Sequence, residues 1–71
     1  MRQYFYIVMH SYVGDDMQLD RIFLQESDAI TFGRRLATKN EDYSVYLYKQ
    51  LIARTATVEF VKYLKPYKTE E

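Results

Sequence analysis

The run Tyr4-Phe5-Tyr6-Ile7-Val8-Met9-His10-Ser11-Tyr12 consists almost entirely of large aromatic and aliphatic residues and carries no acidic or basic charge beyond its histidine. A second run, Tyr43-Ser44-Val45-Tyr46-Leu47-Tyr48, has the same character. Residues of these types favour strands, and successive side chains of a strand point to opposite faces of a sheet. Both runs therefore predict β-strands with two different faces.

The alternation sorts these side chains into two rows. We expect the first row to pack against a helix, and it contains Phe5, Ile7 and Met9, matched by Val45 and Leu47. We expect the second row to lie on the far side of the sheet, and it contains Tyr4, Tyr6, His10 and Tyr12, matched by Tyr46 and Tyr48. The sequence thus predicts a sheet with one dry face and one tyrosine-rich face.

A hairpin and a helix follow from local signals. The first strand spans about 3–13, the turn residues Gly14-Asp15-Asp16 follow it, and a second strand at about 19–25 completes a hairpin. A helix is predicted from the N-cap Ser27 to about Lys39, with Asn40 as a left-handed stop. Its apolar stripe consists of Ala29, Phe32, Gly33, Leu36 and Ala37. Gly33 costs about 1 kcal/mol relative to alanine in a helix, so we expect a close approach of helix and sheet there.

The last part of the chain permits two interpretations. The third strand is predicted at 43–51, and residues 53–64 fit either a fourth strand or a helix, with threonine and valine favouring the strand. Pro66 ends this element, and residues 66–71 are expected to form a frayed tail.

These elements predict a small α+β domain with the order ββαββ. A right-handed crossover from the second to the third strand places the third beside the first. The expected fold is one compact domain over residues 1–71, with an antiparallel sheet of order 2-1-3-4 and one helix packed on one face.

Composition limits the function classes. The chain has 71 residues, no cysteine, one histidine, and ten basic residues against ten acidic ones. A chain this short has a thin core, and without disulfides or a zinc site, self-association is the common remaining source of stability. We expect a cytoplasmic protein, because neither a secretory signal nor a membrane-spanning segment is present.

The tyrosine-rich face indicates a protein-binding surface, because tyrosine buries a large area at low entropic cost. A simpler interpretation is that tyrosine favours strands and keeps its hydroxyl in water. The predicted function is that of a non-catalytic regulator, adaptor or inhibitor that binds another protein, which can be a second copy of itself. The predicted binding residues are Tyr4, Tyr6, His10, Tyr12, Phe23, Tyr46 and Tyr48.

The alternative is a single-stranded nucleic-acid-binding domain, in which bases stack on the same aromatic face. The glycine-aromatic signature of the RNA recognition motif is absent, and the net charge is zero. The backbone contacts would come from Lys49, Arg54, Lys62, Lys65 and Lys68.

Catalysis is not expected. His10 has no serine or cysteine nucleophile at a recognisable spacing, and the neighbouring Ser11 points to the opposite face. The acids Asp15, Asp16 and Asp20 fit turn chemistry better than a metal site. With so few turns and one helix, the chain leaves little room for a pocket of about 300 Å³ or more. We therefore predict no catalytic residue, metal, cofactor, small-molecule substrate or membrane contact.

Overall fold

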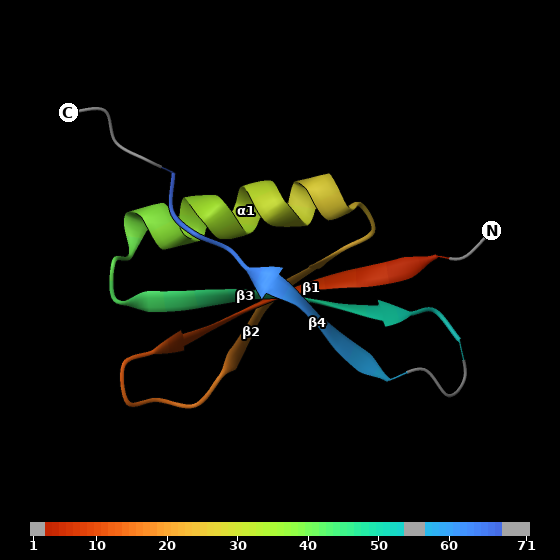
Figure 1. Cartoon of the computed structure of the whole chain (residues 1–71), viewed down its shortest axis with the longest axis horizontal. Helices are drawn as coiled ribbons and strands as arrows, with labels where there is room; N and C mark the ends of the chain where they lie inside the picture. The colour runs from red at the N-terminus through yellow and green to blue at the C-terminus, as the bar shows by residue number, and fades with distance from the viewer. Residues whose placement is uncertain (1–2, 54–56, 68–71) are drawn as a thin grey trace.

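The structure of the chain, a computed structural model, describes residues 3–53 and 57–67. Its elements follow the order β1 (Tyr4–Tyr12), β2 (Gln18–Phe23), α1 (Glu26–Lys39), β3 (Tyr43–Leu51) and β4 (Val58–Tyr63). The four strands form one antiparallel sheet of order β2-β1-β3-β4. The helix lies along one side of this sheet (Figure 1). The predicted α+β class, element order and strand order are confirmed.

The structure places most of the segment that was ambiguous in the sequence, and it shows how the β1–β2 hairpin turns. Residues 58–63 form a strand rather than a helix, whereas residues 54–56 of the ambiguous segment lie outside the described residues. In the β1–β2 hairpin, Gly14 has a φ of 86°, a conformation that suits glycine because other residues rarely adopt it. Asp15 closes this turn by donating its backbone N–H to the Tyr12 carbonyl at 2.8 Å.

The register of the two central strands decides which side chains share a face. Val8 lies opposite Leu47 and His10 opposite Val45, while Ile7 lies opposite Tyr48. Paired residues of an antiparallel ladder point to the same side of the sheet. Even-numbered residues of β1 therefore share the helix side with odd-numbered residues of β3.

The core lies between the helix and this side of the sheet. Its buried members are Val8, Ala29, Ala37, Val45, Leu47 and Leu64. The prediction that Val45 and Leu47 face the helix is confirmed. The prediction that Phe5, Ile7 and Met9 join them is wrong, because in this register an odd-numbered residue of β1 pairs with an even-numbered residue of β3.

Both helix ends differ in detail from the prediction. The helix begins at Glu26, and its N-cap is Gln25, which makes no side-chain cap hydrogen bond, so Ser27 is not the cap. At the other end Asn40 is extended, with a φ of −130°, rather than left-handed. Its backbone N–H and its Nδ2 both donate to the Leu36 carbonyl at 3.1 Å, which satisfies the last turn without a left-handed residue.

The chain after β4 returns along the helix. Leu64 donates its backbone N–H to the Val45 carbonyl at 2.9 Å, and its side chain packs against Gly33. A Cβ on Gly33 would lie 3.3 Å from the Leu64 Cγ and far inside contact distance of its Cδ1. The expected close approach at Gly33 is thus real, and its partner is the residue that follows β4.

Residues 65–67 extend this contact. The Arg34 Nε donates to the Lys65 carbonyl at 3.2 Å, and the Arg34 guanidinium lies 4.1 Å from the centre of the Tyr67 ring. The Tyr67 backbone N–H donates to the Thr38 Oγ1 at 2.8 Å. The tail predicted to fray began at residue 66, and its residues 68–71 lie outside the described part of the chain.

Candidate functional site: an uncharged sheet face

The side of the sheet turned away from the helix is the candidate site, and we call it the open face. Strand register and alternation assign its members. They are Phe5, Ile7, Met9 and Ser11 of β1, Leu19 and Ile22 of β2, Ser44, Tyr46, Tyr48 and Gln50 of β3, and Val58, Phe60 and Tyr63 of β4. Three of these thirteen are polar, and none is charged.

The charged residues of the four strands all lie on the helix side. Arg21 is opposite Val8, Lys49 is opposite Tyr6 and Glu59, and Lys62 is opposite Leu47, whereas Asp20 reaches the helix-side His10. In an antiparallel sheet with one wet face, charges normally occupy the face away from the core. Here that distribution is reversed.

The dimensions of the two layers explain why charges are tolerated beside the helix. A helix is about 10 Å across, whereas four strands about 4.8 Å apart span roughly 19 Å. The helix therefore leaves the edge strands β2 and β4 in water, where Arg21, Glu59 and Lys62 lie, whereas Lys49 lies near the end of the central strand β3. The Arg21 guanidinium lies 5.3 Å from the centre of the Phe32 ring, and the Lys49 Nζ lies 4.7 Å from the centre of the Tyr4 ring.

Four rings of β3 and β4 meet on the open face, and we call them the ring cluster: Tyr46, Tyr48, Phe60 and Tyr63. Phe60 lies at its centre, with ring centroids 5.6 Å from Tyr48, 5.3 Å from Tyr63 and 6.5 Å from Tyr46. Tyr46 and Tyr63 are 5.0 Å apart. The tilted and edge-on angles are those that aromatic pairs prefer, so the four rings pack favourably against one another.

The other half of the open face, on β1 and β2, is mainly aliphatic. Ile7 lies opposite Ile22, and Met9 lies opposite Leu19. Ile22 and Leu19 on the edge strand are about half exposed, as are Phe60 and Val58 on the opposite edge. The open face therefore carries four rings on its β3–β4 half, and Phe5 with aliphatic side chains, among them the buried Ile7, on its β1–β2 half.

The residues predicted from sequence divide between the two sides of the sheet. Tyr46 and Tyr48 lie on the open face as expected. The remaining predicted residues lie on the helix side, and they are Tyr4, Tyr6, His10, Tyr12 and Phe23. Phe23 packs 5.5 Å from Phe32 of the helix, and Tyr6 packs against the core. The predicted convergence of Tyr4 and Tyr6 with Tyr46 and Tyr48 is therefore wrong.

The sequence reasoning missed the β4 half of the ring cluster. Phe60 and Tyr63 fall in the segment for which strand and helix were both open, and only a strand carries them to the same face as Tyr46 and Tyr48. A bulge, in which Val61 is the extra residue opposite Leu47, also breaks simple alternation between Phe60 and Tyr63. The available signal was the density of β-branched and aromatic residues, which favoured the strand.

His10 belongs to a separate cluster on the helix side. Its Nδ1 lies 2.6 Å from the Asp20 Oδ2, and its ring stacks on Tyr43 at 4.2 Å with an interplanar angle of 15°. Tyr12 meets Tyr43 edge-on at 5.9 Å. Asp20 is the extra residue of a bulge in β2, and the bulge turns its carboxylate toward His10. The His10 and Asp20 side chains are only 12% and 17% exposed, so their contact secures the bulge.

Replacing Asp20 with alanine should lower the free energy of unfolding by about 1–3 kcal/mol, because it leaves a mostly buried histidine without its partner. Urea unfolding followed by circular dichroism would measure this loss. Asp16→Ala is the matched control, because it removes an exposed carboxylate from the neighbouring turn. Equal stability of the two variants would show that the His10–Asp20 contact contributes nothing.

The bases proposed for nucleic-acid contacts do not surround the ring cluster. Lys49 and Lys62 lie on the helix side, and Lys65 follows β4 beside Arg34. Arg54 and Lys68 lie outside the described residues. The positive charges that the structure describes are therefore separated from the open face by the sheet itself.

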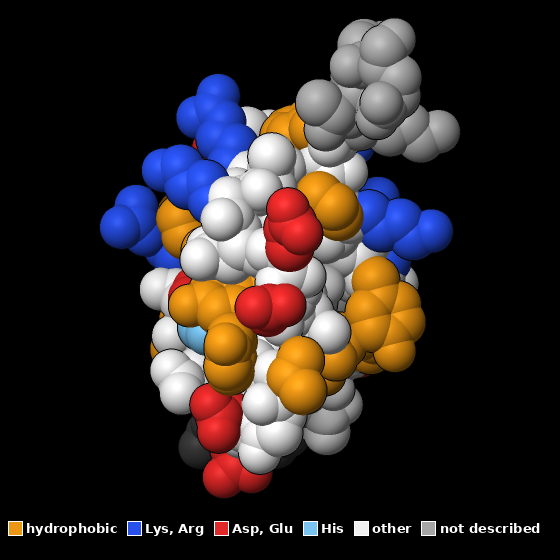
Figure 2. Space-filling model, turned by 90° about the vertical axis from the view of Figure 1, so that its left-hand side faces the viewer, with side chains coloured by type: hydrophobic (Ala, Val, Ile, Leu, Met, Phe, Trp, Pro, Cys, Tyr) orange, Lys and Arg blue, Asp and Glu red, His pale blue; other side chains and the backbone are white. Residues whose placement is uncertain are grey.

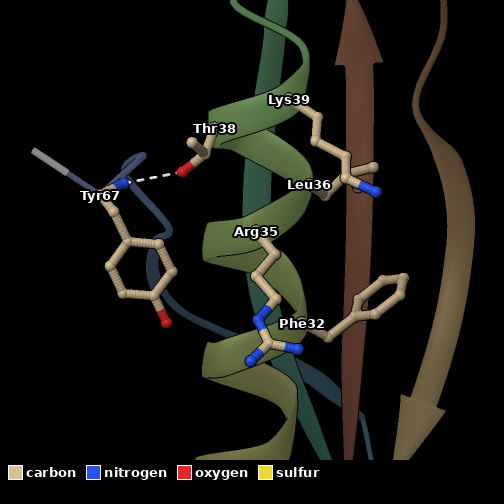
Figure 3. A pocket seen from close by; sticks show the side chains of 6 residues that line it. All are labelled: Phe32, Arg35, Leu36, Thr38, Lys39 and Tyr67. Atoms are coloured by element: carbon tan, nitrogen blue, oxygen red, sulfur yellow. Dashed lines mark hydrogen bonds between the residues drawn. The ribbon is translucent and has the colours of Figure 1, made fainter. Parts of the chain in front are cut away.

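The helix carries an open pocket of about 350 Å³, larger than the sequence led us to expect. Its lining consists of Phe32, Arg35, Leu36, Thr38, Lys39 and Tyr67. Figure 3 shows Tyr67 on one side of the helix and Phe32 and Leu36 on the other, with Arg35 between them. These side chains point in different directions from the helix and from the segment after β4.

Acidic side chains gather at the turns rather than on the open face. Figure 2 views the end of the molecule at which the β1–β2 and α1–β3 turns lie, with acidic groups over its middle and lower parts and basic groups at its upper sides. Asp15, Asp16, Glu41 and Asp42 belong to these two turns and are exposed. Within residues 3–53 and 57–67, no three acidic or histidine side chains are grouped so that they could hold a metal ion.

No family model, curated protein or solved structure matches this chain. The only helix in the described residues is neither long enough nor apolar enough to cross a membrane. The class that the fold defines is a small α+β domain with a tyrosine-rich aromatic sheet face.

Proposed function

We propose that this chain is a non-catalytic protein-binding module, and that the open face is its docking surface. The observation that carries the proposal is the reversed charge distribution of the sheet, with every charged strand residue on the helix side. Uncharged apolar surfaces beyond a few hundred Å² are rare on soluble monomers and mark interaction sites.

The anchors of this surface are Tyr46, Tyr48, Phe60 and Tyr63. Aromatic residues are enriched among the side chains that contribute most to binding, especially near the centre of an interface. Fixed rings lose little conformational freedom on binding, and the tyrosine hydroxyls can still form hydrogen bonds to a partner. A domain of this kind acts by covering a partner's surface, as a regulator, adaptor or inhibitor does.

Tyrosine substitutions on opposite sides of the sheet test this proposal. Tyr63→Ala removes an exposed ring of the open face, and Tyr12→Ala removes an exposed ring of the helix side. We expect Tyr63→Ala to weaken capture of the partner from a lysate of the source cells by about 10-fold or more, as loss of an interface anchor does. We expect Tyr12→Ala to have little effect. Equal capture by the two variants would contradict the proposal.

Single-stranded nucleic acid is the alternative ligand of the ring cluster, and salt dependence distinguishes it. Phosphate contacts weaken steeply as salt rises, whereas an uncharged protein interface changes little. A labelled oligonucleotide retained at low salt, released at moderate salt and lost in Phe60→Ala would favour the alternative.

A further inference from the structure

We infer that the partner of the open face is a second copy of this chain, packed sheet against sheet. This inference rests on the proposed docking function of the open face. The resulting dimer has four layers, with the two sheets in the middle and one helix on each outer side. Sheets that pack in this way lie about 10 Å apart, with their strands about 30° from parallel.

The composition of the open face fits an interface that is always covered. Transient interfaces are about as polar as ordinary protein surface, whereas homodimer interfaces are more apolar. Here ten of thirteen positions are apolar or aromatic, and Ser11, Ser44 and Gln50 are the other three. A second copy is the one partner that is present in equal amount whenever the chain is made.

The size of the open face is sufficient for such a dimer. With strands about 4.8 Å apart and a rise of about 3.3 Å per residue, the four strands cover roughly 500 Å². Burying this footprint on two copies gives roughly 1,000 Å² before side-chain relief is added, which reaches the lower limit for a specific interface.

Charge does not oppose the association. The chain has ten basic and ten acidic residues, so two copies do not repel each other through net charge. The described positions of the open face hold no charged group that would lose its water on pairing. The cost of desolvating charged groups, which often cancels the gain from association, is therefore absent at these positions.

The two halves of the open face carry side chains of different size, and this difference favours one relative orientation of the two copies. The ring cluster occupies β3 and β4, whereas β1 and β2 carry a single ring, Phe5, beside the aliphatic side chains of Ile7, Met9, Leu19 and Ile22. Two interdigitating layers pack best when large side chains meet small ones. The two-fold axis that achieves this lies between the two sheets, parallel to the strands and level with the gap between β1 and β3. Rotation about it places β4 of one copy over β2 of the other.

Analytical ultracentrifugation of matched lysine variants tests the dimer. Ile22→Lys and Phe60→Lys each place a charge on the open face at a half-exposed position, where the monomer fold can tolerate it. Thr31→Lys is the control, because Thr31 is exposed on the helix, on the opposite side of the sheet. We expect a wild-type dimer at micromolar concentration, with its dissociation constant raised at least about 100-fold by either open-face variant and unchanged by the control.

A wild-type monomer up to 100 µM, or a dimer that both open-face variants retain, would overturn the inference. Neither result by itself contradicts the proposed protein-binding function, because that function is tested by a separate experiment, the capture of a partner by Tyr63→Ala. If the chain is monomeric and Tyr63→Ala still captures its partner normally, both proposals fail.

Thiol cross-linking tests the orientation in a chain that has no natural cysteine. We expect a short bifunctional thiol reagent to join Phe60→Cys to Ile22→Cys when the two variants are mixed, and to leave each variant alone largely uncross-linked. Efficient cross-linking of Phe60→Cys to itself would place β4 over β4 and overturn the proposed orientation.

Discussion

Leu47→Ala should leave most of the chain unfolded at 25 °C. Leu47 and Val8 are the largest side chains that are completely buried, and they face each other across the two central strands. Truncation of a buried leucine costs about 2–5 kcal/mol, because contacts are lost and a cavity remains. A core of this size supplies no more than about 3–5 kcal/mol in total, so a single such loss can exceed the available stability.

The matched control for Leu47→Ala is Leu24→Ala, the same chemical change at a leucine that is 66% exposed. We expect Leu24→Ala to change the free energy of unfolding by less than about 0.5 kcal/mol. Far-UV circular dichroism and urea titration at one fixed protein concentration would compare the two variants with the wild type. A Leu47→Ala protein that unfolds at the wild-type urea concentration would show that the core lies elsewhere.

The topology could be predicted from the sequence because its signals are local. Tyr4–Tyr12 and Tyr43–Leu51 are marked as strands by their aromatic and β-branched residues, and the helix between them has a regular apolar stripe. The crossover rule then fixes the order of the strands. None of these steps requires knowledge of the exact pairing between distant residues.

Which side of the sheet each side chain of β1 faces could not be predicted in the same way. A shift of one residue in the pairing moves every side chain of a strand to the other face. Both rows of β1 contain large apolar side chains, since Val8 belongs to the tyrosine row and Ile7 to the other. The choice between them depends on the β1–β3 register, which the long connection through the helix does not fix.

Tyrosine contributed to the wrong assignment of the β1 side chains, because this sheet carries tyrosines on both of its sides. Tyr6 and Tyr43 pack against the core on the helix side, whereas Tyr46 and Tyr48 form part of the ring cluster. A ring with a polar tip can cover the margin of a core as readily as it can cover an open surface. Charged residues indicate the helix side better than tyrosines do here, since the charged residues of the strands lie on that side only.

The charge distribution also connects the fold with the proposed interface. Acidic and basic residues of the strands lie where the narrow helix leaves the sheet in water, and the wider uncharged face lies opposite. Sequence alternation alone could not reveal this, because Asp20 and Val61 occupy bulges that shift the pairing within β2 and β4. The uncharged face emerges only when the registers of all three strand pairings are combined.

Gly33→Ala should destabilise the wild-type chain but stabilise a chain in which Leu64 is replaced by alanine. An alanine Cβ at position 33 would overlap the Leu64 Cδ1, and Leu64 is itself buried beside Val45 with little room to move. Overpacking of this kind costs about 1–3 kcal/mol. We therefore expect Gly33→Ala to destabilise the wild-type chain, although alanine is the better helix former by about 1 kcal/mol.

In a Leu64→Ala background the overlap is removed, and only the helix preference remains. Gly33→Ala should then stabilise the chain by about 1 kcal/mol. Leu64→Ala is expected to cost about 2–5 kcal/mol by itself, so the four proteins are best compared by urea unfolding in a stabilising osmolyte. The same sign of the Gly33→Ala effect in both backgrounds would mean that Gly33 does not serve the packing of Leu64. A reversal would show that the residue after β4 determines how closely the helix approaches the sheet, and that this contact fixes the helix on the side opposite the ring cluster.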